Sequence, residues 1–376
     1  MSSMLSIKRM TLSMTRVRAR GEDVRKFILD HVEKHPTDIC RVTADHFHIT
    51  RQAANKHLQR LTGEKTLTET GNTRSRVYKL CLVLEWSKRY ALLPGLAEDV
   101  IWRQDVAATL GQMPDNVMDI WNWVFTEMFN NAIDHSGGTE IFVHIKKTAT
   151  TTEMLIADDG VGIFKKIQAA LNLLDERHAL LELSKGKVTT DPKNHTGEGV
   201  FFSSRMVDEF DILSGGVYFS HKFGDAEDWI AERSKIGTGT AVWMKLHNHT
   251  SRTTTRILDQ FTSADDYGFR FSKTVVPVRL AQYGNDKLVS RSQAKRLLAR
   301  VELFKMVIFD FSEVPSVGPA FADEIFRIFP TKHPEMELVA IHTSSEVKRM
   351  IEKAKTGRAA DLSDAAARPD SERGSQ

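Results

Sequence analysis

The sequence predicts a multidomain protein of the α/β type, in which a small helical unit with a β-hairpin precedes two α/β domains. The 376 residues are too many for one ordinary core, and the hydrophobic content of 41% suits a globular protein. Helix and strand patterns alternate from residue 119 to 248 and again from 270 to 355. We expect a disordered basic arm (1–20), the helical unit (21–80), a central domain (81–248), a linker with one short helix (249–269), a smaller domain (270–356) and a disordered tail (357–376).

Positive charge is concentrated at the N-terminus. Residues 1–80 carry 16 Lys and Arg against 8 Asp and Glu, whereas the whole chain has a net charge of only +3. A basic front end indicates a polyanionic partner. The first 20 residues contain five basic residues and no acid, and they lack the apolar core of a secretory signal.

The small number of cysteines and the lack of long apolar runs argue against a disulfide-rich, a cysteine-metal or a membrane-spanning protein. Cys40 and Cys81 are the only cysteines, so we expect neither a disulfide framework nor a cysteine metal cluster, and a cytoplasmic location fits. No apolar run approaches the roughly 18 residues that span a bilayer, so no membrane partner is expected.

Three helices and a hairpin are expected in residues 21–80. A short helix over 42–47 is followed by a turn, and Thr50 is suited to cap the third helix. The first and third helices have apolar residues at helical spacing: Val24, Phe27, Ile28 and Val32, then Ala54, Leu58 and Leu61.

Polar and basic side chains remain on the outer face of the third helix and on the hairpin of residues 65–79. Such side chains reach base edges in a major groove and phosphates beside it. We expect DNA contacts from Arg51, Gln52, Asn55, Lys56, Arg60, Arg74 and Arg76. The segment resembles bacterial winged helix-turn-helix domains, which implies duplex DNA as the partner. A winged helix that contacts protein is the alternative.

A helix that begins near Ile120 carries Glu127 and Asn131 four residues apart, and therefore on one face. A carboxylate can orient or deprotonate a water molecule, and an amide oxygen can bind Mg²⁺ beside phosphates. Taken alone, the pair is more often an ordinary exposed pair.

A predicted hairpin over 140–157 leads into Asp158-Asp159-Gly160-Val161-Gly162. A fixed carboxylate at Asp158 can accept the exocyclic amine of adenine. Gly160 and Gly162 would let the backbone approach a flat base. An ordinary Asp-Gly turn is the alternative.

Two further glycine-rich turns follow. A helix-like stretch over 164–183 precedes a polar segment over 184–194, which we expect to be a mobile lid. Gly197 and Gly199 then enter a helix, where free N–H groups suit phosphate oxygens. Thr240 opens a strand and could bond near the adenine.

The order of these motifs over about 130 residues resembles the GHKL ATPase superfamily, which includes gyrase, MutL, sensor histidine kinases and anti-sigma-factor serine kinases. The resemblance implies an α/β sandwich with a mixed sheet under three helices, and ATP and Mg²⁺ as cofactors. It further implies that Asn131 binds Mg²⁺, Asp158 binds the adenine amine, Gly197 and Gly199 bind the phosphates, and Glu127 is the general base.

Sensor histidine kinases usually lack a glutamate at the position of Glu127. No convincing phosphoacceptor histidine on a dimerising hairpin precedes the domain, because His31, His35 and His57 all lie in the helical unit. These observations disfavour autokinase chemistry.

The C-terminal unit is expected to alternate strands (274–281, 305–311, 336–342) with helices (290–300, 317–329, 344–355), and Pro277 suggests an edge strand. Residues 307–318 resemble the core of STAS domains, the anti-sigma antagonist fold. Antagonists carry a phosphoacceptor just before the glycine, where this chain has Val317. This departure favours an interaction module that binds a protein partner.

Three functions are therefore open. The first is an ATP-binding transcriptional regulator in which nucleotide occupancy controls DNA binding, either in one chain or in a homodimer. The second is an anti-sigma-type serine/threonine kinase with Glu127 as base. The third is a GHKL ATPase that cycles between conformations.

Overall fold

The computed structural model describes residues 20–72, 75–188, 197–224, 229–232, 238–265, 268–282 and 287–366. The chain divides into two compact units. The first comprises residues 1–87, 144–154 and 246–250, and the second comprises 88–143, 155–245 and 251–376. Within the described residues, no helix is long and apolar enough to cross a bilayer. The predicted basic arm lies outside these ranges, except for Arg20.

The N-terminal part of the first unit consists of three helices and a hairpin, as the sequence predicts. The helices cover residues 20–31, α2 (Ile39–Phe47) and α3 (Arg51–Gly63). Strands β1 (Leu67–Thr70) and β2 (Val77–Leu80) pair antiparallel. The hydroxyl of Thr50 accepts a hydrogen bond from Ala53 N at 3.2 Å, so it caps α3 as expected.

The predicted apolar stripes form the core of this part of the chain. Val24, Ile28 and Val32 of the first helix and Leu58 and Leu61 of α3 are buried in one cluster. Phe27 lies at its margin, half-buried against His31 and His46.

Seven strands form one sheet, in the order β3 (Leu84–Ala91), β4 (Glu140–Lys147), β5 (Thr151–Asp158), β9 (Thr240–His247), β6 (Glu209–Ser214), β7 (Val217–Lys222) and β8 (Trp229–Glu232). Strand β6 pairs antiparallel with both β7 and β9, and β7 pairs antiparallel with β8.

These pairs are all antiparallel, whereas the family resemblance predicted a sheet that also contains parallel pairs. Short turns connect β4 to β5 and β6 to β7, and such turns permit only antiparallel pairing. Strands β3 and β4 also run in opposite directions, because Val83 N donates to Lys147 O at one end and Leu92 N donates to Thr139 O at the other.

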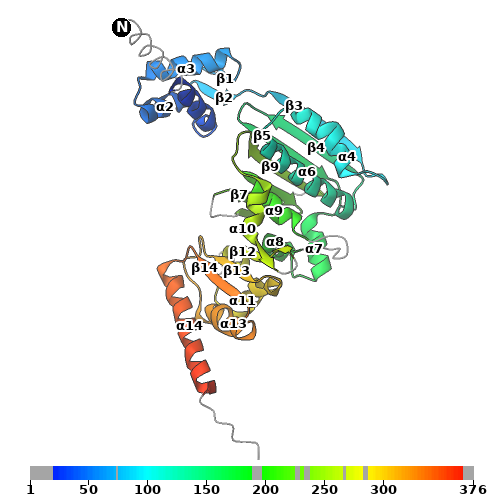
Figure 1. The fold of residues 1–376 in the computed structure, drawn as a ribbon, viewed down its shortest axis with the longest axis vertical. Helices are drawn as coiled ribbons and strands as arrows, with labels where there is room; N and C mark the ends of the chain where they lie inside the picture. Colours follow the sequence, from blue (N-terminus) through cyan, green and yellow to red (C-terminus); the bar gives the residue numbers. More distant parts are fainter. Residues whose placement is uncertain are drawn as a thin grey trace, which may run out of the picture. The chain divides into compact units, whose positions relative to one another are not determined.

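Helix α6 (Asp115–His135) lies over the sheet (Figure 1). Phe129 of α6 packs edge-on against Tyr90 of β3, with 5.5 Å between ring centroids. The preceding helical turns are α4 (Glu98–Ile101), η1 (Trp102–Val106) and α5 (Ala107–Leu110), and Trp102 packs against Phe125.

The stretch over 164–183 is two helices rather than one, namely α7 (Ile163–Leu171) and α8 (Glu176–Lys185). Asn172 ends α7 in the left-handed conformation, and the Asp175 carboxylate caps α8 by accepting from His178 N at 3.0 Å. The start of the predicted mobile segment is also corrected, because Ser184 and Lys185 form the buried last turn of α8. Residues 189–196 lie outside the described ranges.

Regular structure extends into both predicted irregular segments. The predicted linker contains the expected short helix, α10 (Thr254–Phe261), and also strand β10 (Thr262–Asp265) and the start of β11 (Gly268–Phe271). Helix α14 (Ser345–Ala366) continues ten residues into the tail that was expected to be disordered.

Three parallel strands in the order β12 (Lys273–Pro277), β13 (Met306–Asp310) and β14 (Glu337–Ile341) build the C-terminal part of the second unit. Pro277 ends an edge strand, as predicted. The helical segments are η2 (Val278–Ala281), α11 (Arg291–Leu298), η3 (Val301–Leu303), α12 (Pro319–Asp323), η4 (Glu324–Ile328), α13 (Phe329–Lys332) and α14. They match the predicted alternation except for η2, which forms the second half of the strand predicted over 274–281.

Candidate functional site

A cavity of about 290 Å³ opens in the second unit, between α6, the strands and the glycine-bearing start of α9 (Gly199–Met206). Most of the residues predicted for nucleotide binding meet there. Its lining includes Glu127, Asn131, Asp158, Gly197, Gly199 and Thr240. Residues from four sequence segments therefore converge on one cavity.

Helix α6 directs Glu127 and Asn131 into the cavity because its other side is fixed in the core. Trp121, Phe125 and Phe129 are fully buried, and the rings of Phe125 and Phe129 stack 5.1 Å apart. The spacing of four residues then places the carboxylate and the amide one turn apart on the cavity side. The cavity thus receives a candidate base and a candidate Mg²⁺ ligand from one rigid helix.

The adjacent residues Asp158 and Asp159 have opposite roles. Asp159 accepts hydrogen bonds from the Thr139 hydroxyl, from Glu140 N at 3.1 Å and from Thr139 N at 2.7 Å, and these bonds lower its pKa to about 2. Asp158 instead lines the cavity, with Oδ1 accepting from Gly160 N at 2.9 Å. Burial raises the pKa of Asp158, and the backbone hydrogen bonds oppose that shift.

Thr240 joins the Asp158 turn to strand β9. Its backbone N–H donates to Asp158 Oδ1 at 3.3 Å, and its hydroxyl accepts from Ile163 N at 2.9 Å. The hydroxyl of Ser214 lies 3.3 Å from that of Thr240. This network fixes the Asp158 carboxylate in the part of the cavity where we expect the adenine ring.

Gly160 and Gly162 do not line the cavity. A Cβ on Gly160 would overlap the Ser136 carbonyl, so this glycine permits close contact between the turn and the end of α6. Gly162 has φ +98, and a Cβ there would press on the Ser214 hydroxyl. Both glycines therefore shape the turn, and the predicted approach of their backbone to the adenine ring stays a prediction.

Val188, Gly197 and Gly199 form another part of the cavity lining. Val188 N donates to Gly197 O at 3.2 Å, so the two ends of the intervening segment are joined. A Cβ on Gly199 would overlap Glu127 Oε2, which means that the carboxylate lies directly against the start of α9. Free N–H groups at a helix start suit phosphate oxygens.

Several lining residues were missed from the sequence. Lys166 lines the cavity and donates to His135 O at 2.6 Å, at the end of α6. His135, Ser136 and Val188 also line it. The one available signal for Lys166 was its position four residues after Gly162, in the first turn of α7. A lysine in an amphipathic helix gives no further indication of its partner.

The proposed DNA contacts of α3 lie on its outer face. Arg51, Gln52, Lys56 and Arg60 are exposed, and Asn55 is half-buried. Arg60 forms an ion pair with Glu64 at 2.7 Å, and Arg76 of the hairpin pairs with Glu69 at 3.4 Å. Arg74 lies outside the described residues. The two ion pairs reduce the positive potential that Arg60 and Arg76 contribute.

Comparison with known families identifies two domains in the chain. Residues 120–250 match the family model described as "Histidine kinase-, DNA gyrase B-, and HSP90-like ATPase". The chain contains a GHKL-type ATPase domain. Residues 293–348 match the "STAS-like domain of unknown function (DUF4325)". The chain therefore also contains a C-terminal STAS-like domain. No curated protein matches the chain.

The domain implies a bound nucleotide, usually with Mg²⁺. Among the described residues, no group of three His, Cys, Asp or Glu side chains could hold a metal ion. Mg²⁺ beside phosphates usually takes one or two protein ligands and completes its shell with phosphate oxygens and water. Asn131 lines the cavity, and its role as the Mg²⁺ ligand stays a prediction.

We predict that Asp158→Asn weakens adenosine binding by about 1–3 kcal/mol, because the buried amine would lose its ionised acceptor. Asn131→Ala should weaken Mg·ATP and leave adenosine unaffected. Calorimetry with both ligands checks the assignment. Wild-type affinity for both ligands in both variants would contradict it.

The raised pKa of Asp158 adds a pH dependence. Only the ionised carboxylate accepts without offering a competing O–H, so adenosine affinity should fall as the pH drops through this pKa, which lies above the usual 3.8. Binding measured from neutral to mildly acidic pH should show this loss in the wild type and a flatter profile in Asp158→Asn. The same profile in both proteins would exclude Asp158 as the titrating group.

Proposed function

We propose that this protein is an ATP-binding regulator in which Mg·ATP occupancy of the GHKL-type domain controls the binding of duplex DNA by the N-terminal helices. The observation that carries the proposal is the convergence of Glu127, Asn131, Asp158 and Gly199 on one cavity. ATP can shift a conformational equilibrium only as far as it binds one state more tightly.

In this proposal the residues that line the cavity bind different parts of Mg·ATP. Asp158, held by Gly160 N and Thr240 N, accepts the adenine amine. Asn131 binds the Mg²⁺ that accompanies the phosphates, and the backbone at Gly197 and Gly199 receives the phosphates. Glu127 lies against Gly199, where its carboxylate can orient a water molecule for slow hydrolysis.

The N-terminal helices are proposed to bind DNA as a winged helix. Support comes from the excess of basic residues in this segment and from the exposed Arg51, Gln52 and Lys56 on α3. Arg76 directly precedes β2, on the hairpin that we propose contacts the DNA backbone. A recognition helix followed by a basic hairpin is the arrangement that reads a major groove and grips adjacent phosphates.

Transfer of phosphate to protein is the rival outcome. A STAS-type phosphoacceptor would stand at the place of Val317, but Val317 is buried and carries no hydroxyl. Incubation of the full chain with γ-labelled ATP distinguishes the two functions. The proposal expects label in inorganic phosphate and not in protein.

We predict that Glu127→Ala lowers ATP hydrolysis by about 10²–10⁴-fold, the usual effect of a positioned base. Gly199→Ala should also lower it, because the added methyl group displaces the Glu127 carboxylate. Gly63→Ala is the matched control, since a Cβ there meets nothing within 4 Å. Hydrolysis by Glu127→Ala at the wild-type rate would show that Glu127 is not the base.

We also predict that duplex DNA binding weakens steeply with salt, with a slope near −0.9 per phosphate contact. Replacing Arg74 and Arg76 by Ala should weaken all sequences about equally and flatten that slope. Replacing Arg51 or Gln52 should reduce discrimination between sequences, because base-edge contacts carry that information. Fluorescence anisotropy at several salt concentrations measures both effects. An unchanged slope in the double variant would favour a protein-contact role for these helices.

A further inference from the structure

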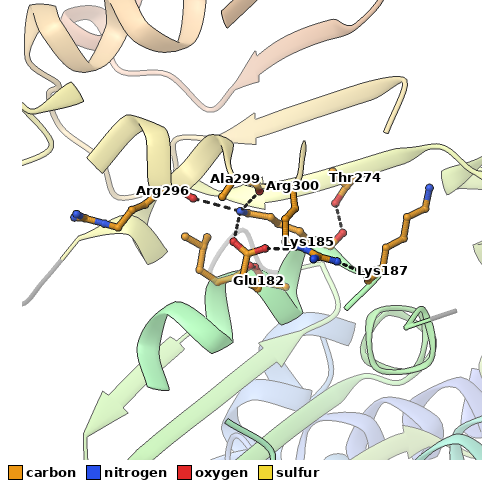
Figure 2. Close-up of polar contacts among 9 residues, drawn as sticks. Glu182, Lys185, Lys187, Thr274, Arg296, Ala299 and Arg300 are labelled. Atoms are coloured by element: carbon orange, nitrogen blue, oxygen red, sulfur yellow. Dashed lines mark hydrogen bonds and ion pairs between the residues drawn. The ribbon is translucent and has the colours of Figure 1, made fainter. Parts of the chain in front are cut away.

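A buried ion pair lies where helix α8 of the ATPase domain meets the STAS-like domain. Lys185 Nζ donates to Glu182 Oε1 at 2.6 Å, and the two side chains are only 1% and 4% exposed. Burying two charges is costly unless further polar groups satisfy them. The Lys185 ammonium finds such groups in the STAS-like domain (Figure 2).

The Lys185 ammonium occupies the C-terminal end of helix α11. It donates to Ala299 O at 2.7 Å and contacts Arg296 O at 3.4 Å. Helix ends leave carbonyl groups without partners inside the helix and carry a partial negative charge, so a cation is stabilised there. Lys185 is therefore the cap of a helix that belongs to the other domain.

Two side chains of the STAS-like domain hold the backbone that follows α8. Thr274 Oγ1 donates to Lys185 O at 2.6 Å, and Arg300 Nη2 donates to Lys187 O at 3.1 Å. The Arg300 guanidinium also lies 3.6 Å from Glu182 Oε2. In this case the donor belongs to the ATPase domain: Lys187 Nζ donates to Leu303 O of the STAS-like domain at 2.8 Å. Residues 182–187 are thus fixed to the STAS-like domain at both backbone and side-chain level.

The residue after this segment lines the nucleotide cavity. Val188 forms part of the wall and is hydrogen-bonded to Gly197. A second connection runs through aromatic rings, because Phe271 packs on Phe201 of α9 at 4.6 Å and on Phe304 at 5.1 Å. The Val188 and Gly199 side of the cavity is therefore braced from the STAS-like domain by two routes.

The adenine side is built without that domain. Asp158, Thr240 and Ser214 are held by one another and by the Gly160 turn. A change in the STAS-like domain should consequently affect the phosphate side of the cavity and leave the adenine side intact.

We propose that Arg300 and Thr274 are positioning residues for the phosphate side of the nucleotide cavity, so that the STAS-like domain tunes ATP affinity through the α8–α11 junction. This inference rests on the proposed function, since it requires that the cavity binds ATP. It gives the STAS-like domain a role that needs no phosphoacceptor. A protein that bound this domain and moved α11 would alter nucleotide affinity, and by linkage ATP would alter the affinity for that protein.

The test compares ATP with adenosine in the full-length chain. Thr274→Val removes the hydrogen bond to Lys185 O, and Arg300→Ala removes the one to Lys187 O together with the ion pair to Glu182 Oε2. Both variants retain the Glu182–Lys185 hydrogen bond. Both variants should bind Mg·ATP roughly 5-fold or more weakly, in the usual range for coupled sites, while adenosine affinity stays at the wild-type value. Arg300→Lys should retain more ATP affinity than Arg300→Ala, because it keeps a cationic donor.

Arg279→Ala is the matched control, because Arg279 forms its ion pair with Glu313 inside the STAS-like domain. Equal ATP affinity in wild type, Arg300→Ala and Thr274→Val would overturn the proposal. So would an equal loss of ATP and adenosine, which indicates general damage to the cavity. If the wild type itself binds neither ligand, the proposed function fails before this inference is reached.

Discussion

The candidate site depends on the way in which two neighbouring aspartates are fixed. Asp159 is held by the backbone N–H groups that begin β4, and this anchors the turn. Asp158 must then point towards the cavity, where Thr240 N reaches it from β9. Among the described residues, the carboxylate of Asp158 accepts hydrogen bonds from the backbone N–H groups of Gly160 and Thr240, and it can accept one more donor from a ligand. Without the anchor at Asp159, the geometry around Asp158 would be one of several turn conformations.

Local sequence rules predicted most of the nucleotide site. Glu127 and Asn131 share a face because of helical spacing, and Asp158 follows directly from a strand that ends at a turn. Most of the alternating strands and helices of the STAS-like domain could also be predicted, because each has its own hydrophobic periodicity. The convergence of Glu127, Asn131 and Asp158 on one cavity was inferred from a family resemblance, because spacing alone cannot show which distant segments meet.

What the sequence did not predict depends on tertiary partners. Lys185 lies in a stretch whose polar composition predicts exposure to solvent, yet it is buried because Glu182 and the end of α11 satisfy its ammonium. The break between α7 and α8 was predictable in principle, because Asn172 and Asp175 are a helix-ending and a helix-capping residue. The antiparallel sheet likewise follows from the short turns after β4 and β6, whereas the family resemblance suggested a mixed one.

We infer that the STAS-like domain holds the phosphate side of an adenine-nucleotide cavity. Hydrogen–deuterium exchange of the full-length chain with and without Mg·ATP measures this coupling. We expect slower exchange in residues 127–136, 158–163 and 197–206 and also in residues 296–304, the end of α11 and η3. Slower exchange confined to the cavity segments would contradict the coupling, and unchanged exchange everywhere would contradict nucleotide binding itself.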